Sequence, residues 1–134
     1  MTVQFSTRVR NARADAIDAT IGASPQMELR SGAQPANPAA AETGIEVSQL
    51  GLPASWMVAA VNGVKAKNGS WTGAAAAAGA IGHFRVKDNA DSQCDMQGSV
   101  TGTGGGGDME LDNVNAAVGQ PITINTFTIT EGNA

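Results

Sequence analysis

The stretch AIGHFRVKDNADSQCDMQGSV, residues 80–100, predicts two short β-strands joined by a polar turn. Successive side chains of a strand point to opposite faces, so Phe84 falls on one side of the first strand and Ile81 and His83 on the other. The turn DNADSQ, residues 88–93, then reverses the chain. The segment therefore predicts an antiparallel hairpin with a thin apolar face, at the centre of a β-rich fold.

The same hairpin holds the one histidine of the chain, His83, and its one cysteine, Cys94. They lie across the turn from each other, but no third group is evident that would orient the imidazole, so a half-buried strand histidine is the ordinary interpretation. The acids Asp88, Asp91 and Asp95 lack the alternating oxygen spacing of a calcium-binding loop. We therefore predict no catalytic residue, no metal site and no cofactor, in a protein that is not an enzyme.

The length of 134 residues predicts one domain over 1–134, with an arm and helix over 1–22 and a β-sandwich over 23–134. Only 24 residues are Leu, Ile, Val or Phe, so we expect the subunit to gain stability from a partner surface. One cysteine excludes an internal disulfide and fits a reducing compartment. No long apolar segment or signal peptide is evident, so neither a membrane partner nor export by the usual route is expected.

Charge is distributed unevenly along the chain, whose net charge is −4. All eight Lys and Arg residues lie at or before Lys87, and seven acids follow it. This asymmetry suits docking between surfaces of opposite sign, including copies of the same chain, although a solvated acidic surface is the ordinary explanation. Nucleic acid is not an expected partner, because the net charge is negative and the basic residues form no patch interleaved with aromatic residues.

The N-terminal segment predicts one helix over residues 7–21, with Ser6 as its N-cap and Gly22 as its stop. Its small apolar stripe would cover either the molecule's own sheet or another chain. The residues of this stripe are Val9, Ala12, Ala16 and either Ala19 or Thr20, with Ile17 and Ile21 beside it. Arginines in the first turn oppose the helix dipole, so they either contact a partner or remain in solvent. The first set of candidate partner-contact residues is Phe5, Arg8, Arg10 and Arg13.

The segment SGAQPANPAAAETG, residues 31–44, predicts a loop or an extended arm, because it contains two prolines and no large apolar residue. Loops longer than about 12 to 15 residues tend to be functional or mobile. We expect this segment to become ordered when it docks on a partner. The second set of candidate contact residues is Gln34, Pro35 and Pro38.

Alternating apolar and polar residues predict further strands over 26–31, 45–52, 109–114 and 121–130. The phase of the last pattern changes near Asn125, which suggests a bulge or burial on both sides. With the hairpin, this gives seven or eight short strands. That count predicts a mainly β, antiparallel sandwich or barrel with one N-terminal helix.

Three other segments carry particular expectations. Trp56 and Trp71 are the largest apolar residues and are predicted to lie in the core. Five alanines over 74–78 are too few to nucleate a helix, so a strand or extended segment is predicted. The stretch TGTGGGGD, residues 101–108, lacks the lysine of a phosphate-binding loop and predicts a flexible hairpin tip.

Four longer segments resemble a family of small structural proteins of tailed phages and prophages, among them the cement, or decoration, proteins of phage heads. They are FSTRVRNARADAIDATIGASP, LPASWMVAAVNGVKAKNGSWTG, GHFRVKDNADSQCDMQGSV and DMELDNVNAAVGQPITINTFTITEGNA, which together span nearly the whole chain. Their shared motifs are structural and identify no catalytic site.

The resemblance implies a jelly-roll sandwich that binds the outside of an icosahedral phage head. Its implied partners are the major capsid protein, whose neighbouring subunits it would bridge, and a second copy of itself as a homodimer. Its implied location is the virion, after synthesis in the host cytoplasm. Two alternatives remain: a head-to-tail or tail structural component, and a carbohydrate-binding module, since jelly rolls often bind glycans.

Overall fold

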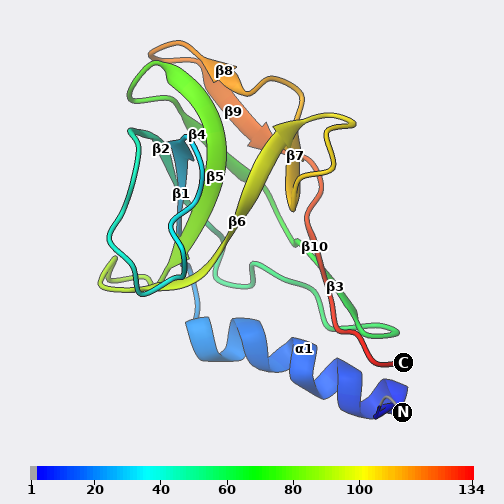
Figure 1. The fold of residues 1–134 in the computed structure, drawn as a ribbon. Helices are drawn as coiled ribbons and strands as arrows, with labels where there is room; N and C mark the ends of the chain where they lie inside the picture. Colours follow the sequence, from blue (N-terminus) through cyan, green and yellow to red (C-terminus); the bar gives the residue numbers. More distant parts are fainter. Residues whose placement is uncertain (1–2) are drawn as a thin grey trace.

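The computed structural model describes residues 3–134 and is mainly β, with one α-helix at the N-terminus (Figure 1). This confirms the predicted fold class, a β-sandwich-like arrangement with a single N-terminal helix. The elements are α1 (Thr7–Ile21), β1 (Gln26–Ser31), β2 (Glu46–Gly51), β3 (Val64–Ala66), β4 (Trp71–Ala74), β5 (Gly79–Lys87), β6 (Cys94–Gly102), β7 (Met109–Leu111), β8 (Asn115–Ala116), β9 (Pro121–Ile124) and β10 (Thr128–Thr130).

The main sheet has the strand order β2-β1-β5-β6-β7, and β8 pairs with the beginning of β5. Two separate two-stranded ribbons, β4–β9 and β3–β10, accompany it. All of these strand pairs are antiparallel except β6–β7, which is parallel and places Val100 opposite Met109. Helix α1 lies across one end of the strands, and the C-terminus lies near the beginning of this helix (Figure 1).

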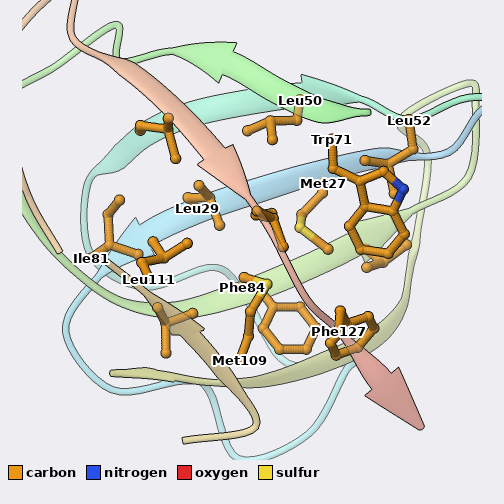
Figure 2. Packing of buried hydrophobic residues seen from close by; sticks show 14 of the residues in the cluster. Met27, Leu29, Leu50, Leu52, Trp71, Ile81, Phe84, Met109, Leu111 and Phe127 are labelled. Atoms are coloured by element: carbon orange, nitrogen blue, oxygen red, sulfur yellow. The ribbon is translucent and has the colours of Figure 1, made fainter. Parts of the chain in front are cut away.

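Aromatic side chains form a continuous series through the hydrophobic core (Figure 2). Trp71 lies with its ring centroid 6.0 Å from that of Trp56 and 5.6 Å from that of Phe127. Phe127 then meets Phe84 edge-on, with the centroids 5.5 Å apart. Both tryptophans are buried, as predicted, so a few large rings supply much of the apolar contact that the many alanines cannot.

Helix α1 begins and ends where its capping residues predict. The Ser6 hydroxyl accepts a hydrogen bond from the Val9 amide, and Gly22 ends the helix with a φ of 95°. The predicted apolar stripe is right only in part: Ile21, expected beside it, is buried and Ile17 packs against the core, whereas Ala12, Ala16 and Ala19 are exposed. The reason is that the helix docks mainly through polar contacts, since Asp15 and Asp18 both pair with Lys65 of β3.

The central hairpin is confirmed, with β5 antiparallel to β6, but β5 is buried on both faces. A register shift at Gly82, where Ser31 pairs with Ile81 and Arg30 with His83, turns Ile81 to the core side together with Phe84. Ile81 and His83 therefore lie on opposite faces, contrary to the prediction. Gly82 has no room for a side chain, because a Cβ atom there would lie 2.3 Å from the Gly32 carbonyl oxygen.

Two predicted extended segments turn instead between sheets. The alanines after β4 form a corner in which the Ala76 amide donates to the Val47 carbonyl at 2.7 Å. Residues 121–130 form two strands, because β9 pairs with β4 whereas β10 pairs with β3. Ile124 and Phe127 are both buried, and an uninterrupted strand would point side chains three residues apart in opposite directions.

The glycine-rich segment after β6 is a tip, as predicted, but it joins two parallel strands and so is not a hairpin. Side chains of the flanking strands close it. The Glu110 carboxylate accepts hydrogen bonds from the Gly104 and Gly106 amides at 3.0 and 3.2 Å, and the Thr101 hydroxyl accepts one from Gly107 at 3.0 Å. The glycine amides therefore already have an anionic partner within the chain.

Candidate interaction surfaces

A segment of residues 32–44, here called the strap, covers the outer face of the main sheet. Polar side chains of the sheet bind its backbone carbonyls. His83 Nδ1 lies 2.8 Å from the Gly32 oxygen, and Arg85 donates to the Pro38 and Ala40 oxygens at 3.0 and 3.2 Å. Further donors, Gln97 and Arg30, bind the carbonyls of Pro35, Thr43 and Gly44.

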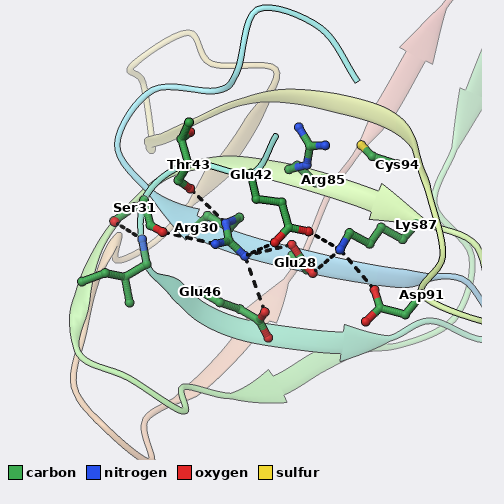
Figure 3. A network of polar contacts seen from close by, with 12 residues as sticks. Glu28, Arg30, Ser31, Glu42, Thr43, Glu46, Arg85, Lys87, Asp91 and Cys94 are labelled. Carbon is green, nitrogen blue, oxygen red and sulfur yellow. Dashed lines mark hydrogen bonds and ion pairs between the residues drawn. The ribbon is translucent and has the colours of Figure 1, made fainter. Parts of the chain in front are cut away.

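An ionic network lies beneath the end of the strap (Figure 3). Glu28 is 2% exposed, and its carboxylate lies 3.1 Å from Arg30 Nη1 and 2.8 Å from Lys87 Nζ. Glu42 of the strap pairs with the same two cations. Glu46 of β2 adds a longer contact to Arg30, at 3.5 Å. The strap is thus attached to β1 and β5 by charge as well as by backbone hydrogen bonds.

The pKa values in this network reflect two opposing effects. Burial lowers the pKa of Lys87, but hydrogen bonds to Glu28 and Glu42 outweigh it and raise this pKa above its ordinary value. The hydrogen bond from Lys87 lowers the pKa of Glu42. The pKa of Glu46 is raised, chiefly by burial and then by the nearby Glu28 carboxylate.

The strap is a loop, as predicted, but it is not a free arm, because its backbone is already bound to the sheet within a single chain. Of the three residues proposed there as partner contacts, Gln34 and Pro38 are exposed, whereas Pro35 is buried. The expectation that the whole segment becomes ordered only on docking is therefore wrong. Its outward side chains remain available to a partner.

The N-terminal contact residues also bind their own chain. Phe5 is half-buried, with the Arg13 guanidinium 5.1 Å from its ring centroid, and Arg13 pairs with Glu131 at 2.9 Å. Arg10 donates to the Asn62 carbonyl at 3.2 Å. Arg8 is exposed. Three of the four residues therefore secure the arm and helix to the C-terminal strand and the β3 turn, and Arg8 extends into solvent.

An exposed face of β-branched side chains lies beside this turn, and sequence reasoning did not single it out. Val58, Val61 and Val64 are 41%, 65% and 37% exposed, and the backbone pairs Val61 with Val64. On the adjoining strand β10, Thr128 and Thr130 are exposed as well. These five residues are here called the valine ribbon. Within residues 3–134, β10 pairs with β3 alone, so the ribbon ends in an open strand edge.

The structure separates the two residues that sequence reasoning tested for chemistry. His83 pairs with Ser99 across the hairpin, whereas Cys94 pairs with Lys87 at the far end of the strand. Burial raises the pKa of the Cys94 thiol, which disfavours the reactive thiolate. Asp88 closes the intervening turn by accepting hydrogen bonds from Ser92, which lower the pKa of its carboxyl group.

No family model, no curated protein and no solved structure matches the chain. In the part of the chain that the structure describes, no cluster of histidine, cysteine or carboxylate side chains is arranged to hold a metal ion. Likewise, no helix within residues 3–134 is long and apolar enough to cross a membrane.

Proposed function

We propose that the chain is a non-enzymatic structural protein of a phage virion, a cement protein that binds the outside of the head and bridges neighbouring major capsid subunits. The resemblance of four long segments to phage structural proteins, nearest to the head cement protein of the short-tailed Bordetella phage, motivates the proposal. Its proposed partners are the major capsid protein and a second copy of the chain.

The valine ribbon is the observation that carries this proposal. Three neighbouring valines that are between 37% and 65% exposed give an apolar surface that water solvates poorly. Apolar patches bordered by polar residues commonly mark protein–protein contacts. The ribbon also ends in the open edge of β10, where another chain finds unpaired backbone groups.

Charge beside the ribbon favours a partner surface with exposed acids. Arg10 binds the carbonyl of Asn62, directly next to Val61. Arg8 is exposed and lies two residues earlier in α1, so it faces another side of the helix. The positive charge of Arg10 thus lies beside the ribbon in a chain whose net charge is −4. Opposite charge orients an encounter and excludes wrong partners more than it adds affinity.

The mechanism is mechanical. Each copy buries a modest area, near the ~1,000 Å² that a specific contact requires, across a boundary between capsid subunits. Many such contacts act together on a symmetric shell, so their sum resists the outward pressure of packaged DNA.

The copy number in purified virions tests the proposal. Quantitative mass spectrometry should find hundreds of copies of the chain for each head. A single ring of copies would instead support a head-to-tail or tail component, and no copies would refute a virion role. Glycan arrays should give no binding, because Trp56 and Trp71, the residues expected to stack on sugars, are buried.

Two matched variants test the valine ribbon. Val61→Asp should reduce binding to heads that lack the chain at least tenfold, because it places a charge in the apolar contact. Val118→Asp is the control, since Val118 is 70% exposed, comparable with the 65% of Val61, but lies between β8 and β9. Arg8→Glu should also weaken binding without lowering the melting temperature. Equal binding by Val61→Asp and the wild type would show that the ribbon is not the docking surface.

A further inference from the structure

We infer that a groove beside the strap binds a small oxyanion through the guanidinium of Arg85. The groove has a volume of about 650 Å³ and lies between residues 37–42 of the strap and residues 92–94 of the β5–β6 turn. Arg85, Lys87 and Cys94 also line it. It is distinct from the valine ribbon, so this inference does not depend on the proposed function.

Arg85 differs from the other cations beneath the strap. It is 2% exposed, yet within residues 3–134 no carboxylate lies within ion-pair distance of its guanidinium. Its three hydrogen bonds go to uncharged oxygens, the carbonyls of Pro38 and Ala40 and the amide of Gln97. Its Nε is buried without a hydrogen-bond partner. By contrast, Arg30 and Lys87 each pair with at least two carboxylates.

A buried charge without an opposite charge is unfavourable, and a buried donor without an acceptor adds to the cost. An oxyanion in the groove supplies the opposite charge, because Arg85 lines the groove, whereas the enclosed Nε stays out of its reach. Nη2 already donates to two strap carbonyls and Nη1 to Gln97. The guanidinium therefore offers its positive charge and one remaining Nη1 N–H to carboxylate or phosphate oxygens. The ligand class is therefore a compact oxyanion, such as phosphate, sulfate or a carboxylate.

The other charged groups of the groove permit such a ligand. Glu42 is the one carboxylate in its lining; it pairs with Lys87 and Arg30, and the charge of Arg85 acts on it from beyond ion-pair distance. With Arg85 and Lys87, the lining carries two positive charges and one negative charge. Ser92 and Gln93 at the opposite wall contribute neutral polar groups.

Cys94, the one cysteine of the chain, provides a native reporter inside the groove. In the full-length protein, the rate of its reaction with an uncharged maleimide is measured while phosphate, sulfate or acetate replaces chloride at constant ionic strength. We expect at least a threefold, saturable decrease in rate at millimolar oxyanion. The decrease follows because the ligand shields the thiol and cancels the positive charge of Arg85, which otherwise favours the thiolate. Protection by acetate alone identifies a planar carboxylate site, and protection by phosphate or sulfate identifies a tetrahedral one.

Variants assign the effect to Arg85. Arg85→Gln should abolish the saturable decrease, because it removes the positive charge, whereas Arg85→Lys should retain part of it, because lysine keeps the charge. Lys67→Gln is the control, since Lys67 lies outside the groove, over the ring of Trp71 at 5.7 Å. If the Arg85 variants do not fold, the wild-type protein is titrated with the oxyanion and its arginine Nε–H signals are followed by NMR. One of these signals should change its chemical shift and reach a plateau. A labelling rate that is independent of the oxyanion, equal protection in a folded Arg85→Gln, or unshifted Nε–H signals would overturn the inference.

Discussion

Replacing Glu28 by glutamine removes the negative charge between two buried cations. Removing one partner of a buried ion pair costs about 3–5 kcal/mol, because the remaining charge stays buried without compensation. Arg30 and Lys87 both retain Glu42, so we expect the lower end of this range, about 3 kcal/mol. Such a loss corresponds to a decrease in melting temperature of roughly 10 °C for a domain of this size.

The matched control is Glu46→Gln in the same network. The Glu46 carboxylate lies 3.5 Å from Arg30, but its side chain is 40% exposed, against 2% for Glu28. Water and salt screen an exposed pair, so its removal should cost less than about 1 kcal/mol. The two substitutions thus compare the same chemical change at two depths.

Urea unfolding followed by tryptophan fluorescence measures both variants, because Trp56 and Trp71 are buried and become solvated on unfolding. Equal slopes with different midpoints would show that stability has changed rather than compactness. A loss below about 1 kcal/mol for Glu28→Gln, or equal losses in the two variants, would refute the view that burial makes Glu28 the critical charge.

Three further expectations concern local features of the fold. Gly98→Ala should lower the free energy of unfolding in urea by about 1–3 kcal/mol, because the new Cβ would lie 2.6 Å from the ring of Phe84. Gly102→Ala on the same strand is the control, since its Cβ has space and the free energy of unfolding should change little. Raising the pH above 10.5, the ordinary pKa of lysine, should lower the free energy of unfolding. The reason is that Lys87 loses its proton in the unfolded chain but retains it in the folded chain, where its pKa is raised. A free energy of unfolding that stays constant from pH 10 to 12 would contradict this. Ser6→Ala should cost about 1 kcal/mol by removing the N-cap acceptor, measured as a lower melting temperature, and a melting temperature equal to that of the wild type would contradict the capping role.

The features that sequence reasoning predicted well depend on neighbouring residues. Ser6 and Gly22 define the ends of α1 through their own hydrogen bonds and backbone angles. The polar turn between β5 and β6 is closed by contacts of Asp88 with Ser92, four residues away. In both cases the chemistry that stabilises the element lies within the element itself, so a local pattern was sufficient.

The features that were missed depend on distant partners. The strap has no apolar pattern, and side chains of the sheet bind it through its backbone carbonyls. Every residue carries a backbone carbonyl, so the sequence of the strap does not indicate that buried arginines bind it. A signal was present in the strands, where Arg85 lies between the apolar residues Phe84 and Val86 and requires a covering layer if both faces are buried. Likewise, the phase change near Asn125 was visible, but the exchange of partner strands there involves pairing with residues 47 to 66 positions away.

The attachment of the strap has a consequence for proteolysis. A protease needs an extended segment whose backbone is free to enter its active site, and long exposed loops usually supply one. The carbonyls along residues 32–44 are instead bound by side chains of the main sheet, so cutting there requires the strap to detach from Arg30 and Arg85. A nonspecific protease should therefore cleave this segment only as fast as the strap detaches from the sheet, in contrast to an ordinary surface loop of the same length.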